Sequence, residues 1–120
     1  MIKRHTISFK NAFKGMIWAL QTQPNYRIHF FLSILSIVGG IVLKISYYEW
    51  LITILLITIG LAIETINTAI EEATDAIDKK QREDIRIAKD VAAGAMLFFA
   101  IGAFIIASII FLPKISNFKF

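Results

Sequence analysis

Residues 91–112 read VAAGAMLFFAIGAFIIASIIFL, a run of 22 residues without a charged side chain. An α-helix rises about 1.5 Å per residue, so this run is long enough to cross the roughly 30 Å hydrocarbon core of a bilayer. Pro113 follows directly and predicts that the helix ends there. The sequence therefore indicates an integral membrane protein whose last span covers residues 91–112.

Two further apolar runs lie upstream of this span. The first span is expected over residues 28–45, although its uncharged stretch from Phe30 to Leu43 has only 14 residues. The second is expected over residues 50–70 and continues into a connection at residues 71–90. Three aromatic residues, which favour the headgroup level, mark the beginning of the second run: Tyr47, Tyr48 and Trp50.

Residues 1–22 combine basic side chains with apolar ones at helical spacing. This pattern predicts an amphipathic helix lying on the membrane surface, which Pro24 separates from the first span. A solvated leader is the alternative. The fold expected is all-α, with three transmembrane helices and one N-terminal surface helix forming a single domain over residues 1–120.

The composition supports a membrane protein. Hydrophobic residues make up 57% of the 120 residues and charged residues 18%, both displaced from the soluble average. The absence of cysteine excludes disulfides, zinc–thiolate sites and iron–sulfur clusters. A net charge of +4 raises the question of nucleic-acid binding, but the basic residues flank apolar runs and offer no basic surface on a soluble domain.

The distribution of basic residues predicts the orientation in the membrane. Five precede the first span, five lie in residues 71–90, and the turn between the first two spans has only Lys44. Lysine and arginine favour the cytoplasmic side. We therefore expect a multi-pass protein of the cytoplasmic (inner) membrane, with its N-terminus and the 71–90 connection in the cytoplasm.

Polar residues follow one face of the second long helix. At 100° per residue they fall within a sector of about 80°. Because a carboxylate in a span is costly, such groups are functional candidates. Glu64 could alternatively hold the bundle together through hydrogen bonds. The members of this polar stripe are Glu64, Asn67, Glu71, Asp75 and Asp78.

The third span begins among small residues, with Ala88 and Ala92 at a spacing that allows close helix packing. Close packing would bring Lys89 beside the polar stripe. A lysine near several carboxylates indicates phosphate binding with a divalent cation, for which Mg²⁺ is suited. In the alternative interpretation, Lys89 extends to the membrane surface and pairs with Asp90.

Several common signatures are missing from the sequence. The glycines form neither a P-loop nor a dinucleotide-binding or protein-kinase motif, so any nucleotide chemistry needs another scaffold. His5 and His29 lie 24 positions apart and form no metal-binding pair by their spacing. His29 is interpreted as an interfacial residue.

The block Glu64-Thr-Ile-Asn67-Thr-Ala-Ile-Glu71, followed by Asp75 and by Lys89-Asp90, resembles the small prokaryotic diacylglycerol kinase family, which includes the undecaprenol kinases. The resemblance extends to residues 25–29 and to nearly the full chain. It implies an ATP-dependent lipid kinase that works as a homotrimer, with its active site at the cytoplasmic membrane surface and shared between subunits.

The resemblance also implies roles for individual residues. Glu64 would be the catalytic base that withdraws the proton of the lipid hydroxyl, and Glu71 would bind Mg²⁺. Many members have a glutamate beside that metal where this chain has Gln23, so altered metal binding is expected. The residues expected to hold ATP are Asn67, Asp75, Lys89, Asp90 and Arg4.

These observations favour phosphorylation of undecaprenol to undecaprenyl phosphate, with diacylglycerol as the alternative acceptor. The partners expected are the lipid substrate, ATP, membrane lipids and two further copies of the chain. A carboxylate-lined cation or proton carrier is the alternative of a different class, since acids in spans also mark ion routes. A non-catalytic helper subunit of a membrane complex is the third hypothesis.

Overall fold

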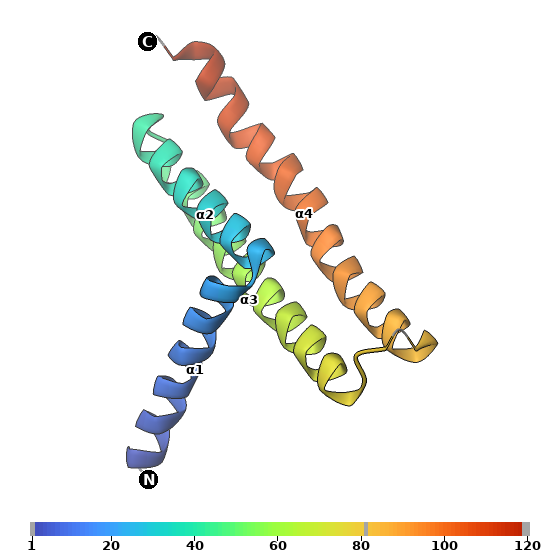
Figure 1. Cartoon of the computed structure of the whole chain (residues 1–120). Helices are drawn as coiled ribbons and strands as arrows, with labels where there is room; N and C mark the ends of the chain where they lie inside the picture. Colours follow the sequence, from blue (N-terminus) through green and yellow to red (C-terminus); the bar gives the residue numbers. More distant parts are fainter. Residues whose placement is uncertain (1, 81, 119–120) are drawn as a thin grey trace.

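A computed structural model describes residues 2–80 and 82–118, and all the regular structure in these ranges is helical. The four helices are α1 (Ile2–Thr22), α2 (Pro24–Val42), α3 (Tyr47–Ile77) and α4 (Glu83–Asn117). Figure 1 shows α2, α3 and α4 running side by side while α1 diverges from them. The predicted all-α architecture is therefore confirmed.

Three of the helices are long and apolar enough to cross a bilayer. Their mean hydropathy rises along the chain, from 1.4 in α2 and 1.9 in α3 to 2.7 in α4. Large apolar side chains point outward, with Phe98 85% and Ile109 69% exposed. An apolar surface of this extent is unfavourable in water and is accommodated by lipid. The chain is a multi-pass membrane protein.

Local sequence explains where α2 and α3 begin. Pro24 occupies the first turn of α2, where its missing N–H is not needed. Ser46 caps α3: its hydroxyl accepts from the Glu49 amide while the Glu49 carboxylate accepts from the Ser46 amide, at 3.3 and 2.9 Å. This reciprocal capping box fixes the start of the second span.

The prediction that Pro113 ends the last helix is wrong. Helix α4 continues through Pro113 to Asn117. A proline inside a helix removes one backbone hydrogen bond, so the turn around it needs other support. Lys114 supplies an ion pair to Glu49 at the beginning of α3, with Nζ and Oε1 3.1 Å apart. This contact ties the last turns of α4 to the neighbouring span.

A tight turn at residues 43–46 joins α2 to α3. Lys44 has a positive φ of 53° there, and Ile45 is buried. The two helices approach closely beside the turn, because a Cβ added to Gly40 would lie 2.7 Å from the Trp50 ring. The absence of a side chain at Gly40 thus allows α2 and α3 to form an antiparallel hairpin.

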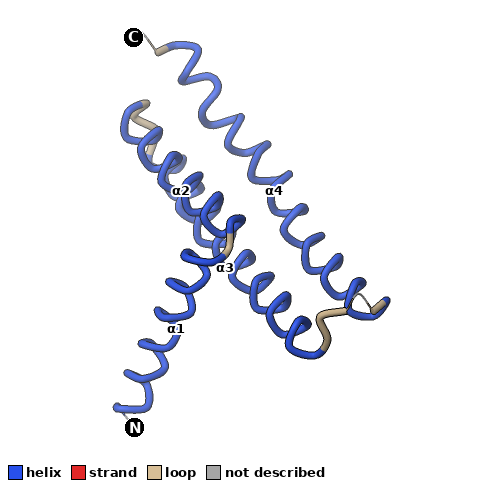
Figure 2. The backbone as a smooth tube through the Cα atoms, in the orientation of Figure 1, coloured by secondary structure: helices blue, strands red, loops and turns tan. Residues whose placement is uncertain are grey.

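Helix α3 lies at the centre of the fold and packs against the other three helices. The long stretch of α4 beside it is visible in Figure 2. Gly60 of α3 allows this approach, since a Cβ at that position would lie 2.7 Å from the Phe99 ring. Ala92 is buried, in agreement with the prediction that small residues let α4 pack closely.

Helix α1 joins the bundle through its C-terminal part, where Ala19 is 3% exposed. Its apolar side chains Phe9 and Phe13 are exposed and lie with basic residues on a helix that leaves the bundle at an angle (Figure 1). This arrangement is compatible with a helix on the membrane surface, and that placement stays a prediction.

Candidate active site

A polar pocket of about 220 Å³ lies between α2, α3 and α4. Helix α3 contributes Glu64, Asn67 and Glu71, which the helical spacing placed on one face. Helix α2 contributes Asn25 and His29. The remaining lining residues come from α4 and are uncharged: Ala93, Met96, Leu97 and Ala100. The first three residues of the polar stripe thus line a pocket that all three spans enclose.

Glu64 is the most buried acid of the stripe and is only 3% exposed. Its Oε2 atom lies 3.6 Å from Nε2 of His29, at ion-pair distance. A carboxylate at this depth in a span is costly and is kept where it has a partner or a function. Because Glu64 also lines an open pocket, its oxygen atoms are within reach of a bound molecule.

Asn67 lies one turn further along α3 and is 7% exposed. Its Oδ1 atom is buried and has no hydrogen-bond partner among residues 2–80 and 82–118. Leaving such an acceptor unsatisfied costs about 1–3 kcal/mol, so it calls for an explanation. A ligand in the polar pocket that donates to this oxygen or coordinates it would supply one.

The donor atoms in the pocket suit Mg²⁺. The Glu71 carboxylate and the unsatisfied Asn67 amide oxygen line the same cavity, and both are the hard oxygen ligands that this ion prefers. Within the part of the chain that the structure describes, no three acid or histidine side chains form a metal cluster. Mg²⁺ commonly uses one or two carboxylates together with substrate phosphates, so this donor set fits.

Lys89 lies beside the polar stripe, as the small residues of α4 predicted. Its ammonium group donates a hydrogen bond of 2.5 Å to Oδ1 of Asp75 on α3. This bond, with smaller contributions from Glu71 and Glu72, raises the pKa of Lys89 above its ordinary value, against the opposing effect of desolvation. Lys89 therefore stays cationic one helical turn before Ala93, the first residue of α4 that lines the polar pocket.

The alternative pairing of Lys89 with Asp90 is wrong. Asp90 accepts instead from Arg86 one turn earlier on α4, at 2.9 Å. Residues four apart lie on the same face of a helix, whereas neighbours in sequence point about 100° apart. The side chains of Lys89 and Asp90 consequently serve different partners.

Five of the predicted site residues do not line the polar pocket of their own chain: Asp75, Lys89, Asp90, Gln23 and Arg4. Gln23 lies at the N-cap position of α2 without a side-chain capping bond, and its side-chain nitrogen donates to the Thr22 hydroxyl at 3.4 Å. Arg4 lies 15 positions before the buried Ala19, about 22 Å along α1, on the part that leaves the bundle (Figure 1). Neither lines the polar pocket.

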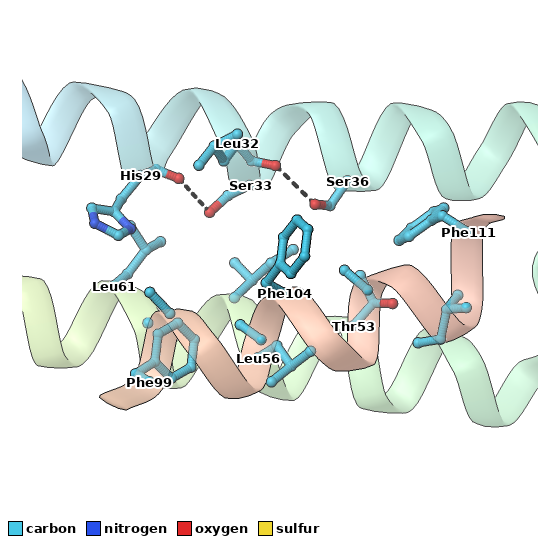
Figure 3. A pocket seen from close by; sticks show the side chains of 16 residues that line it. His29, Leu32, Ser33, Ser36, Thr53, Leu56, Leu61, Phe99, Phe104 and Phe111 are labelled. Carbon is cyan, nitrogen blue, oxygen red and sulfur yellow. Dashed lines mark hydrogen bonds between the residues drawn. The ribbon is translucent and has the colours of Figure 1, made fainter. Parts of the chain in front are cut away.

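An apolar cavity of about 400 Å³ adjoins the polar pocket. Figure 3 shows its side chains converging from three helices, with Leu32 from α2, Leu56 and Leu61 from α3, and Phe99, Phe104 and Phe111 from α4. His29 and Ala100 line both cavities, which are therefore neighbours. An apolar molecule in the larger cavity can thus present a polar end to Glu64.

His29 is the residue of this site whose environment the sequence did not reveal. Its interpretation as an interfacial residue gave it no contact, whereas the structure turns its ring toward Glu64. The two residues are 35 positions apart on different helices, so no spacing rule links them. Only the register between α2 and α3 brings them together.

Comparison with known proteins identifies related sequences. The model of the family described as "Prokaryotic diacylglycerol kinase" matches residues 10–111, a range that contains the whole polar pocket and Lys89. An "Undecaprenol kinase" of Bacillus subtilis (strain 168) is 36% identical over 114 residues, which cover 95% of this chain and 93% of that relative.

A second relative is a "Diacylglycerol kinase" of Synechocystis sp. (strain ATCC 27184 / PCC 6803 / Kazusa). It is 34% identical over 110 residues, covering 91% of this chain but only 63% of the relative. Both relatives are thus similar over nearly the whole of this chain. They differ in the lipid for which they are named.

Proposed function

The chain belongs to the prokaryotic diacylglycerol kinase family, and we propose that this lipid kinase phosphorylates undecaprenol. ATP is its co-substrate. The similarity to the undecaprenol kinase covers almost the full length of both proteins, which favours this acceptor. Diacylglycerol remains the alternative, because the Synechocystis relative is named for it. The family membership does not favour the cation or proton carrier.

The observation that carries the proposal is the position of Glu64, whose buried carboxylate lines the polar pocket beside an apolar cavity. A lipid whose chain lies in the apolar cavity would bring its hydroxyl to this carboxylate. Glu64 then accepts the hydroxyl proton as the lipid oxygen attacks the γ-phosphorus of ATP. A general base needs this kind of hydrogen-bond access to the proton that it removes.

The nucleotide would occupy the polar end of the site. Phosphoryl transfer depends mainly on positioning and on compensating the negative charge of the phosphates. Lys89 supplies a cation, and the free Asn67 oxygen and Glu71 carboxylate would hold Mg²⁺ or the nucleotide. When bound, Mg²⁺ would neutralise charge on the phosphates. Asp75 orients the Lys89 ammonium through its hydrogen bond.

The remaining assignments complete the proposal. Asp90 would contact the nucleotide, and Arg4 and Gln23 would join the site from a neighbouring subunit of a homotrimer, since neither lines the pocket of its own chain. The basic residues of the N-terminal region and of the 71–90 connection support a cytoplasmic orientation in the inner membrane. That orientation would expose the polar pocket to ATP.

The test is phosphate transfer from radiolabelled ATP with Mg²⁺, using the full chain in lipid-containing micelles. Undecaprenol and diacylglycerol are offered separately. Preferential labelling of undecaprenol is the expected result, whereas preference for diacylglycerol would reverse the acceptor and keep the kinase chemistry. Label in neither lipid would contradict the proposal. A sucrose-gradient or mass measurement in detergent tests the homotrimer.

A further inference from the structure

We propose that His29 acts through Glu64, as a positioning residue that takes up the proton which Glu64 removes from the lipid hydroxyl. The inference rests on the proposed function of Glu64 and extends it to a second residue. It starts from the contact between the two side chains, whose Nε2 and Oε2 atoms are 3.6 Å apart.

The two side chains differ in exposure, which favours proton transfer from Glu64 to His29. The Glu64 side chain is 4% exposed, whereas the His29 side chain is 24% exposed. The ion-pair partner of the less exposed Glu64 is therefore the more exposed imidazole of His29. His29 also lines both the polar pocket and the apolar cavity, so it lies where a lipid hydroxyl would enter.

The charges around His29 favour a protonated imidazole after the transfer. The titratable groups that line the polar pocket with it are Glu64 and Glu71, both from α3. The pocket residues from α4 are all uncharged, and Asn25 is the other contributor from α2. An imidazolium at this position would face carboxylates and no cation among the residues that line the pocket, which offsets part of the cost of burying its charge.

The step balances without a further reactant. The lipid oxygen forms a bond to the γ-phosphorus of ATP while the bond from that phosphorus to the β–γ bridging oxygen breaks, and ADP leaves. The hydroxyl proton passes to a Glu64 carboxylate oxygen and then to Nε2 of His29. Release of that proton to water restores the ionised Glu64 for the next turnover.

Two substitutions separate proton uptake from mere packing. His29→Gln keeps an amide that can hydrogen-bond Glu64 but cannot accept the proton. We expect its kcat to fall about tenfold to hundredfold, with the KM for ATP changed less than about twofold. His29→Ala leaves space for a small base, and added imidazole should restore part of its rate. The matched control is His5→Gln, at the exposed histidine of α1.

The pH profile gives an independent readout. With His29 accepting the proton, kcat of the parent protein rises with pH as the imidazole becomes neutral, and His29→Gln loses that rise. Retention of the parental kcat and profile by His29→Gln would overturn the inference, as would an inactive His29→Ala that imidazole does not rescue. Absence of lipid labelling by the parent protein would instead contradict the proposed function itself.

Discussion

The two neighbouring cavities differ in whether their polar side-chain atoms have hydrogen-bond partners. In the apolar cavity, the hydroxyls of Ser33, Ser36 and Thr53 each donate to a backbone carbonyl four residues earlier, at 2.8 Å. Figure 3 shows the bonds of Ser33 and Ser36. In the polar pocket, Asn67 Oδ1 has no such partner within the described ranges. The hydroxyls are satisfied by their own helices, while the amide oxygen is left available.

This difference suits one cavity to an apolar lipid chain and the other to a polar ligand. Internally satisfied hydroxyls add little polarity, so the larger cavity offers an apolar environment suited to a lipid chain. The smaller pocket keeps buried carboxylate and amide oxygens for a polar ligand, at a cost in stability. Substitutions in the polar pocket should therefore change the chemical step or nucleotide binding, and substitutions in the apolar cavity should change the affinity for lipid.

The largest effect is expected for Glu64→Gln. Removing the base should lower kcat by about a thousandfold, within the range that general-base catalysis contributes. Binding of ATP should be retained, because Glu64 is not assigned to the nucleotide. Steady-state kinetics and equilibrium binding of a fluorescent ATP analogue measure the two quantities. Glu72→Gln is the matched control, since Glu72 is exposed on the same helix outside the polar stripe; equal losses in both variants would contradict the role of Glu64.

The next effect concerns the cationic end of the polar pocket. Lys89→Ala should raise the KM for ATP about tenfold, the effect of losing one charge-assisted hydrogen bond. Lys79→Ala, at an exposed lysine of the loop after α3, should leave it unchanged. A fall in kcat with an unaltered KM would reverse the roles assigned to Lys89 and Glu64.

The pKa of Lys89 adds a pH dependence to this prediction. Because hydrogen bonding to Asp75 raises that pKa in the folded protein, the contact stabilises the fold fully below the ordinary lysine value of 10.5. The stabilisation is lost as the pH rises through the higher folded value. Thermal unfolding of the parent and Lys89→Ala proteins should therefore differ at pH 7 and converge at strongly alkaline pH.

A smaller effect is expected in the apolar cavity. Ala107→Phe would fill part of the space that α4 leaves there and should raise the KM for lipid about threefold to tenfold, with the KM for ATP unchanged. Ala95→Phe, at an exposed position of the same helix, is its control. An increase in the KM for ATP alone would contradict the separation of the two cavities.

The smallest effect is expected at Gln23. Gln23→Glu would add a carboxylate where many relatives are expected to have one, and should lower the half-saturating Mg²⁺ concentration about twofold to threefold. Titration of activity with Mg²⁺ measures the shift. An unchanged Mg²⁺ dependence would show that Gln23 is not at the metal.

The parts of the molecule that follow from local rules could be predicted from the sequence. The uncharged run at residues 91–112 lies within α4, and three members of the polar stripe, Glu64, Asn67 and Glu71, line one pocket. The last member of the stripe, Asp78, lies beyond the end of α3 and is not on the helical face. The close approach of Lys89 to the stripe also followed, from the small residues around it. The sequence did not predict which of the several acids would be its hydrogen-bond partner, which is Asp75.

The sequence did not predict which residues form pairs between helices. The pairing of His29 with Glu64 depends on the register of α2 against α3, which no spacing within one helix encodes. The continuation of α4 past Pro113 likewise coincides with a tertiary ion pair, formed by Lys114 with a residue 65 positions earlier, Glu49. Local signals for ending a helix are overridden when such a contact supports the following turn.

The tight turn between α2 and α3 has a consequence for how the chain enters the membrane during synthesis. Helix α2 has 19 residues and the lowest mean hydropathy of the three spans, so it partitions weakly on its own. The four-residue turn and the contact of Gly40 with Trp50 couple it to the more apolar α3. The two helices would therefore insert together as a hairpin, with α3 providing most of the driving force for both.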